Sequence, residues 1–133
     1  MPSFSEEEIA YMASQRLARI STAAPDGQPD VSPVGFEFDG THLFVGGGDP
    51  VRTRKFRNVR AGNNKVAIVI DDVVTTDPWA PRYLRIYGVA ELVERSTPSG
   101  TAPCMKITPS VSWSCNLEGK PLTADRRVRR TVH

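Results

Sequence analysis

The sequence lacks the features that direct a chain into or through a membrane. It contains no apolar run of eighteen residues, which is about the length that a membrane-spanning helix needs. A secretory signal starts with basic residues and continues with an apolar stretch, whereas Met1–Phe4 lead into Ser5 and three glutamates. We therefore expect a cytoplasmic protein with no membrane partner.

Cysteine and histidine are scarce. The two cysteines, Cys104 and Cys115, and two histidines, one of them His133, do not provide the ligands of a zinc site, and we predict no metal. In a cytoplasmic chain the cysteines are expected to be free thiols. Neither has a neighbouring histidine to activate it, which disfavours a catalytic cysteine.

Familiar catalytic motifs are also missing. The chain has no Gly-x-Gly-x-x-Gly after a first strand, no Gly-x-Ser-x-Gly elbow and no histidine suited to general-base catalysis. If the protein is an enzyme, the catalytic residues stay unknown at this level. A bound cofactor is then expected to supply the difficult chemistry.

The 133 residues present suit one soluble domain, and the net charge of +2 says little about partners. Basic residues nevertheless gather within 52–60 and within 126–130. Such clusters either face solvent or bind an anion. Nucleic acid is the weaker alternative, because few aromatic residues accompany the arginines.

Local patterns predict a mainly β chain with two short helices. Ser5 and Glu8 form a capping box for the first helix, whose apolar stripe would be Ile9, Met12 and Ala13. Turn signals at 25–27 and 39–40 divide residues 17–46 into a three-stranded antiparallel meander. The remaining elements are a helix over 51–61 and strands over 65–70, 82–94 and 104–113, with loops over 77–81 and 96–103.

Three features suggest a ligand site. Thr53, Arg54 and Lys55 follow a glycine run and combine a hydroxyl with two cations, which suits a phosphate. Pro33 and Gly35 interrupt the strand that starts at Val31, leaving backbone groups free for a planar ring or marking an ordinary edge irregularity. Trp79 and Trp113 would cover a ring, fill a dimer contact or pack in the core.

These residues resemble the pyridoxamine-5′-phosphate-oxidase-like superfamily of FMN-binding split β-barrels, and within it the branch that uses the deazaflavin coenzyme F420. The resemblance covers roughly residues 5–115. It depends on the segments Arg16–Thr22, Asp26–Pro29, Val31–Phe36, Thr53–Val59, Val66–Asp72 and Arg85–Glu91.

The resemblance implies a six- to seven-stranded antiparallel split β-barrel with short flanking helices. Residues 1–115 would form this cofactor-binding domain, and residues 116–133 a polar, basic C-terminal tail that is disordered in part. Family members are homodimers with two cofactor sites at the interface, so Trp79 or Trp113 would reach across from the partner.

By similarity, the cofactor would contact residues from four segments. Thr53, Arg54 and Lys55 would hold its phosphate, with Asn58 on the same helix. The ring would meet Val31, Ser32, Pro33, Val34 and Gly35 along one strand, and Ile70 and Asp71 on another; Gly47 and Gly48 would let the ribityl-like chain pass.

The resemblance also implies an activity. Reduced F420 would give a hydride to an electron-poor small molecule with a conjugated C=C bond, a quinone-like group or a polycyclic skeleton. FMN-dependent chemistry and non-catalytic flavin binding are the alternatives. The proton would come from solvent or from Tyr83 or Tyr87. Pyridoxamine phosphate oxidase activity itself is not expected, because we find no further C-terminal substrate-binding segment.

Overall fold

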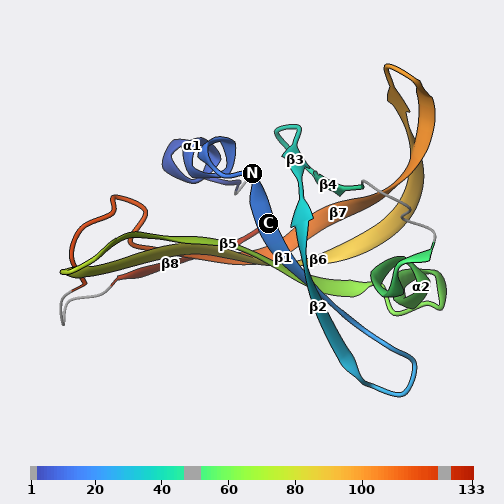
Figure 1. Cartoon of the computed structure of the whole chain (residues 1–133), viewed down its shortest axis with the longest axis horizontal. Coiled ribbons are helices and arrows are strands. Elements are labelled where there is room, and N and C mark those ends of the chain that lie inside the picture. The colour runs from blue at the N-terminus through green and yellow to red at the C-terminus, as the bar shows by residue number, and fades with distance from the viewer. Residues whose placement is uncertain (1–2, 47–51, 123–126) are drawn as a thin grey trace.

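A computed structural model describes residues 3–46, 52–122 and 127–133. This part of the chain forms one antiparallel sheet of eight strands with two short helices (Figure 1). The mainly β, antiparallel prediction is confirmed. The elements are α1 (Glu6–Ser14), β1 (Leu17–Ala23), β2 (Pro29–Gly35), β3 (Glu37–Phe38), β4 (Leu43–Val45), α2 (Arg54–Arg60), β5 (Lys65–Thr76), β6 (Trp79–Thr97), β7 (Gly100–Cys115) and β8 (Val128–Val132).

The first helix begins as predicted but buries a different face. The Ser5 hydroxyl accepts from the backbone N–H of Glu8, and the Glu8 carboxylate accepts from that of Ser5. The buried residues are Glu8, Tyr11 and Met12, whereas Ile9 and Ala13 of the expected stripe are exposed. The stripe shifts because Glu8 and Tyr11 find polar partners inside the fold.

The predicted three-stranded meander is wrong. The sheet order is β2-β1-β5-β6-β7-β4-β3, so β2 and β3 lie at opposite ends of the sheet although only Phe36 separates them in sequence. The β3–β4 hairpin pairs instead with β7, where Leu43 lies opposite Ile107 and both side chains are fully buried. This burial of apolar side chains gives β4 its position.

The long hairpins extend further than the turn signals indicated. Asp71 and Asp72 were expected to end their strand, but β5 continues to Thr76 because both carboxylates have cationic partners. The predicted loop over 77–81 is only a tight turn at Asp77–Pro78, and its other residues belong to β6. The predicted loop over 96–103 is mostly strand as well, since β6 and β7 stay paired out to Thr97 and Gly100.

Strands β6 and β7 shift register between Tyr87 and Gly88, which marks a bulge at this point. The barrel core is built from fully buried side chains of five strands and α2. Its largest members are Phe56, Ile20, Leu43, Ile68, Ile70, Leu84, Ile86, Met105 and Ile107.

The C-terminal tail contains a strand that sequence analysis did not predict. Val128–Val132 form β8, which pairs with residues 111–115 of β7, next to the part of β7 that β4 occupies. Among the described residues, no helix combines the length and the apolar character needed to cross a bilayer.

Candidate functional site

The basic segment after the β3–β4 hairpin forms a short helix that points its cations outward. Phe56 and Val59 of α2 are buried against the barrel, so Arg54 and Arg57 lie on the exposed side, with Lys55 half-buried. Thr53 occupies the position before the helix. In the described part of the chain, Arg54 and Lys55 form no ion pair with an acidic side chain. These cations are therefore available to an anionic group from outside.

Asn58 holds this helix in place. Only 4% of its surface is exposed, and its side-chain amide donates to the Thr22 hydroxyl at 2.9 Å. Asn63 adds a second link from its side-chain amide to the Ala23 carbonyl, also at 2.9 Å. The Asn58 side chain is thus directed into the fold, and the structure gives it a positioning role beneath the cations.

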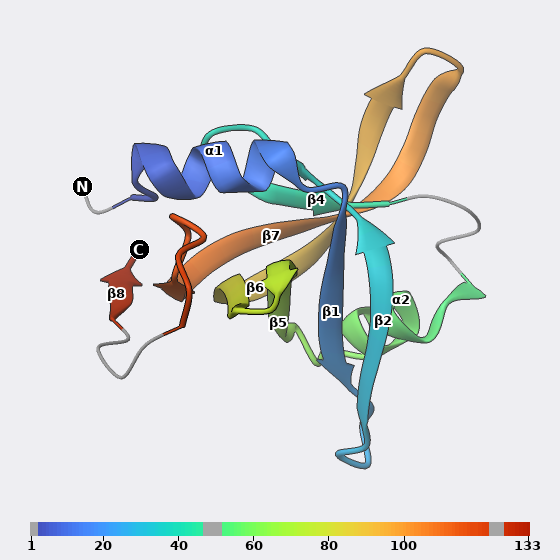
Figure 2. The ribbon, with the colours of Figure 1, turned by 60° about the vertical axis from the view of Figure 1, so that its left-hand side comes forward.

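Strand β2 provides a free edge next to this helix (Figure 2). Within the described residues it pairs with β1 alone, and Val31, Pro33 and Gly35 are exposed while Val34 is buried. A side chain added at Gly35 would meet no atom within 4 Å. The Ser32 hydroxyl is buried without a hydrogen-bond partner. The strand thus offers open space and free backbone groups along its edge, whereas the Ser32 side chain lies on the inner face, opposite the buried Ile20.

A hollow of about 520 Å³ opens where β2 ends. The Arg95 guanidinium lies over the Phe44 ring at 3.9 Å from its centroid, and its Nη1 donates to Glu37 Oε2 at 2.6 Å. This group could not be predicted from local sequence patterns, because its members come from separate hairpins. The lining residues are Gly35, Phe36, Glu37, Phe44, Gly46, Arg95, Ser96, Thr97, Pro98, Ala102, Pro103 and Cys104.

The structure does not gather all the predicted cofactor residues into one place. Ile70 is fully buried in the core, so its side chain cannot touch a ring outside the barrel. Asp71 is exposed and forms an ion pair with Arg19 at 3.0 Å. Gly47 and Gly48 lie outside the described residues.

The two tryptophans lie on other parts of the sheet. Trp79 starts β6 at the tip of the β5–β6 hairpin, at the opposite end of the molecule from α2 (Figure 1). Trp113 is on β7, where its ring contacts Tyr87 edge-on at 4.8 Å and Arg85 stacks on it at 4.2 Å. Within one chain, Trp79 can therefore not cover a ligand bound at α2, and the Trp113 ring is packed against Tyr87 and Arg85. Tyr83 is also on β6, opposite Asp71.

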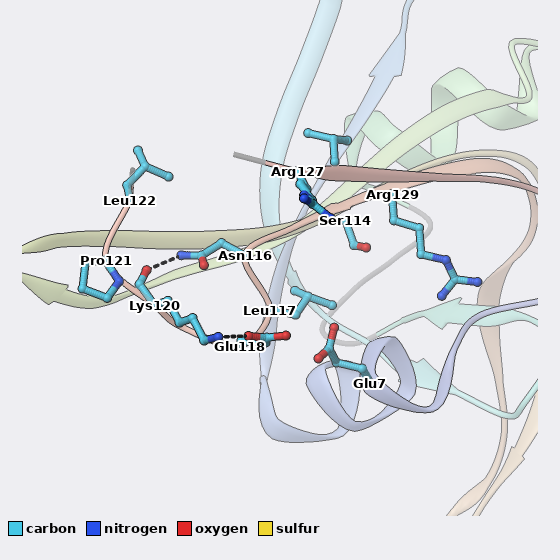
Figure 3. Close-up of a pocket in the computed structure, with 11 residues that line it drawn as sticks. Glu7, Ser114, Asn116, Leu117, Glu118, Lys120, Pro121, Leu122, Arg127 and Arg129 are labelled. Atoms are coloured by element: carbon cyan, nitrogen blue, oxygen red, sulfur yellow. Dashed lines mark hydrogen bonds and ion pairs between the residues drawn. The ribbon is translucent and has the colours of Figure 1, made fainter. Parts of the chain in front are cut away.

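A larger hollow of about 820 Å³ lies on the side of α1 and β8 (Figure 3). Its charges are largely paired: Lys120 contacts Glu118 at 2.8 Å, and Arg129 contacts the buried Glu8 at 3.4 Å. Its lining contains none of the predicted cofactor residues. We regard the smaller hollow as the better candidate site because it adjoins β2.

The buried Tyr11 and the partly buried pair Arg82–Asp72 fix α1 to the sheet. Arg82 donates to both oxygens of Asp72, at 2.7 and 3.0 Å, and the Tyr11 hydroxyl donates to Asp72 at 2.7 Å. The hydrogen bonds from Arg82 are the main reason that the pKa of Asp72 is lowered, and burial is the main reason that the pKa of Tyr11 is raised. The two pKa shifts keep Asp72 ionised and Tyr11 protonated, so that the carboxylate can accept the hydrogen bond that the hydroxyl donates.

The cysteines do not form a catalytic centre. Cys104 and Cys115 are free and buried. Burial raises the pKa of the Cys104 thiol, which keeps it protonated at neutral pH. Cys104 therefore acts as part of the wall of the hollow rather than as a nucleophile.

Known proteins that are similar to this chain show its family. A family model described as pyridoxamine 5′-phosphate oxidase matches residues 4–110. The chain belongs to the pyridoxamine 5′-phosphate oxidase family. Its similarity to a relative from Streptomyces rimosus subsp. rimosus, a 5a,11a-dehydrotetracycline/5a,11a-dehydrooxytetracycline reductase, is 43% identity over 142 residues, covering 96% of this chain and 99% of the relative.

Solved structures agree on the fold of the family. An F420 reductase matches with a TM-score of 0.57 and 21% identity, over 74% of this chain and 90% of its own. A heme storage protein of Vibrio cholerae matches with a TM-score of 0.62 and 19% identity, over 79% and 89%. At these identities the likeness shows the fold alone. The family and the reductase relative together support an oxidoreductase built on this fold.

The residues present fit a phosphorylated flavin-type cofactor. Thr53, Arg54 and Lys55 provide a hydroxyl and two cations, which are groups suited to a phosphate, and the open space at Gly35 leaves room for a flat ring. The anchor of α2 at Thr22 lies level with Asp30, and Gly35 lies five residues further along β2. At a rise of about 3.3 Å per residue, roughly 16 Å separates the two levels, which suits an extended molecule.

Proposed function

We propose that this protein is a reductase that binds coenzyme F420 and reduces an electron-poor C=C bond in a conjugated polycyclic molecule. The observation that supports the proposal is the 43% identity, over nearly the full length of both chains, to a reductase of dehydrotetracyclines. The cations of α2 and the open edge of β2 fit the cofactor that this reaction needs.

In this proposal, reduced F420, when bound, would supply the hydride for one carbon of the C=C bond and be oxidised, and solvent would supply the proton for the other carbon. The chain contributes binding and orientation. Thr53, Arg54 and Lys55 hold the phosphate, and the free edge of β2 bonds the polar rim of the ring. Arg57 and Arg60 follow on the same helix and would receive the acidic oligoglutamate tail of F420, which FMN lacks.

Strand β2 can orient the cofactor ring only if the strand itself is held firmly in the fold. Its inward residue Val34 is buried, and β1 pairs with it over its whole length from Leu17–Gly35 to Ala23–Pro29. The cations are fixed in turn because α2 is bonded to β1 through Asn58. The edge of β2 and the cations of α2, which form the two halves of the proposed site, are thus both held in place by β1.

We also propose that the protein acts as a homodimer with two such sites. Residues opposite one another in an antiparallel pair lie on the same face, and the register brings Val31, Tyr87 and Val132 into one row across the outer face. All three are exposed in the single chain. An apolar row of this kind is typical of a contact surface. A partner would also bring its own β5–β6 hairpin, with Trp79, toward the site.

The proposed function is tested by titrating the purified protein with F420 and, separately, with FMN, following the fluorescence of each. We expect tight F420 binding, weak FMN binding, and oxidation of reduced F420 when conjugated polycyclic acceptors are added. A preference for FMN would assign the chain to flavin-dependent chemistry. F420 binding without turnover on a broad acceptor panel would indicate a carrier, and binding of neither cofactor would refute the proposal.

A further inference from the structure

The hollow at the end of β2 lies between two hairpins. Glu37 and Phe44 are opposite one another in the β3–β4 hairpin, and Arg95 is opposite Ala102 in the outer part of the β6–β7 hairpin. Side chains from both hairpins therefore meet across the hollow. Phe36 and Phe44 give it two aromatic surfaces, and Arg95 is its only cation among the described lining residues.

The Arg95 guanidinium is held against the Phe44 ring, and its contacts leave N–H groups that can donate to a ligand. Its guanidinium stacks on Phe44 at 3.9 Å, which leaves its N–H groups to donate within the plane of the stack. One nitrogen donates to Glu37 at 2.6 Å. The Glu37 side chain is 70% exposed, so this ion pair is weak and a ligand can compete for it.

The hollow also shares a border with the proposed cofactor site. Gly35 ends the free edge of β2 and lines the hollow, and its missing side chain leaves both sides open. A flat molecule between Phe36, Phe44 and Arg95 would therefore lie beside a ring bound along β2. This adjacency is what a hydride acceptor requires.

We infer that this hollow is the acceptor site and that Arg95 is a specificity-determining residue that selects planar acceptors carrying an ionised enol. In such a vinylogous acid, two oxygens share one negative charge in the plane of the conjugated system, as in a carboxylate. A stacked guanidinium offers matching donors in one plane, and charge-assisted bonds of this kind are stronger than neutral ones. The inference deepens the proposed function and rests on it.

Two naphthoquinones of nearly equal size serve as probes. 2-Hydroxy-1,4-naphthoquinone is ionised at neutral pH and has the enolate, whereas 2-methyl-1,4-naphthoquinone is neutral. Equilibrium dialysis against the purified chain without cofactor measures both affinities. We expect the hydroxy compound to bind about tenfold more tightly, as one charge-assisted hydrogen bond allows.

Three substitutions separate recognition from folding. Arg95→Gln should abolish the preference and leave the affinity for the methyl compound unchanged. Glu37→Gln removes the competing carboxylate and should strengthen binding of the hydroxy compound, an opposite effect that general damage would not produce. Lys120→Gln makes the same charge change as Arg95→Gln at an exposed residue of the other hollow, and should change neither affinity.

Several results would overturn the inference: equal binding of the two quinones to the unaltered chain, loss of both together in Arg95→Gln, or binding of neither. If Arg95→Gln does not fold, Arg95→Lys retains the charge without the planar fork and should lose most of the preference. These outcomes do not depend on cofactor, so the F420 titration decides the proposed function separately.

Discussion

At the scale of single residues, the phosphate role of Lys55 makes a direct prediction. Lys55→Ala should weaken F420 or FMN binding by about 1–3 kcal/mol, the usual cost of a lost charged hydrogen bond. Fluorescence titration measures the change in Kd. Lys120→Ala is the matched control, because it removes a lysine whose partner is the exposed Glu118. Equal affinities for Lys55→Ala and the unaltered chain would exclude the phosphate site.

Substitution by alanine is expected to lower the stability of the fold at Gly88 but not at Gly35. At Gly88 a Cβ would lie 2.6 Å from Ile107 Cγ2 and 2.9 Å from the Thr108 carbonyl oxygen. Gly88→Ala should therefore destabilise the fold by about 1–3 kcal/mol, as overpacking does. In Gly35→Ala the added methyl group meets no atom, so the free energy of unfolding should stay unchanged while cofactor binding weakens. Urea unfolding of both variants measures their stabilities, and fluorescence titration measures cofactor binding to Gly35→Ala. Equal stabilities of the two variants would contradict the prediction.

Residues that are neighbours in sequence could be found from the sequence, and residues that meet only in the fold could not. Thr53–Lys55 are adjacent on one short helix, so their pattern alone indicated an anion site. The same reasoning could not tell that Asn58 turns inward or that Ile70 is wholly buried. Arg95 and Phe44 gave no signal, because only the pairing of distant hairpins brings them together.

At the scale of elements, α1 and β8 share a cluster whose stability depends on pH. His133 shares a hydrogen bond of 2.8 Å with the buried Ser112, and its ring contacts Phe4. Burial lowers the pKa of His133 below its ordinary 6.5, with Arg129 contributing and Glu8 opposing. The folded protein thus binds this proton less readily than the unfolded chain. Its contribution to stability is present above about pH 6.5 and is lost as the pH falls through the folded-state pKa.

The prediction is that thermal stability declines between pH 7 and pH 5 in the unaltered chain and declines less in His133→Gln. His42→Gln is the control, since His42 faces Asp39 in an exposed turn and lies outside the cluster. Differential scanning calorimetry across this range measures the effect. An identical pH profile for His133→Gln and the unaltered chain would contradict it.

Strand existence was easier to predict than strand length or pairing. The apolar alternation of β1 and the start of β5 indicated strands at the right residues. The acidic pair Asp71–Asp72 looked like an end, because its partners Arg19 and Arg82 come from other strands. The position of β3 and β4 could not be predicted for the same reason. A turn signal is local, whereas the edge that a hairpin joins depends on contacts far along the chain.

At the scale of the whole molecule, the row of Val31, Tyr87 and Val132 predicts the oligomeric state. Val132→Glu places a charge in this row and should convert a dimer into a monomer, halving the mass measured by light scattering. Ile9→Glu alters an exposed apolar residue on α1 and should leave the dimer intact. A Val132→Glu protein that remains dimeric would show that the outer face is not the contact surface.

Only Phe36 joins β2 to β3, which are the two ends of the sheet, so the sheet has to curl until its ends meet. This closure constrains the order in which the protein can fold during synthesis. The β1–β2 hairpin can close as soon as it leaves the ribosome. The β3–β4 hairpin is made next, but its partner is Met105–Ile107 of β7, so it must wait until most of the chain has emerged. Domains generally complete folding only when such distant strands are present. The barrel is therefore expected to close in one late step, with the acceptor hollow among the last parts to form.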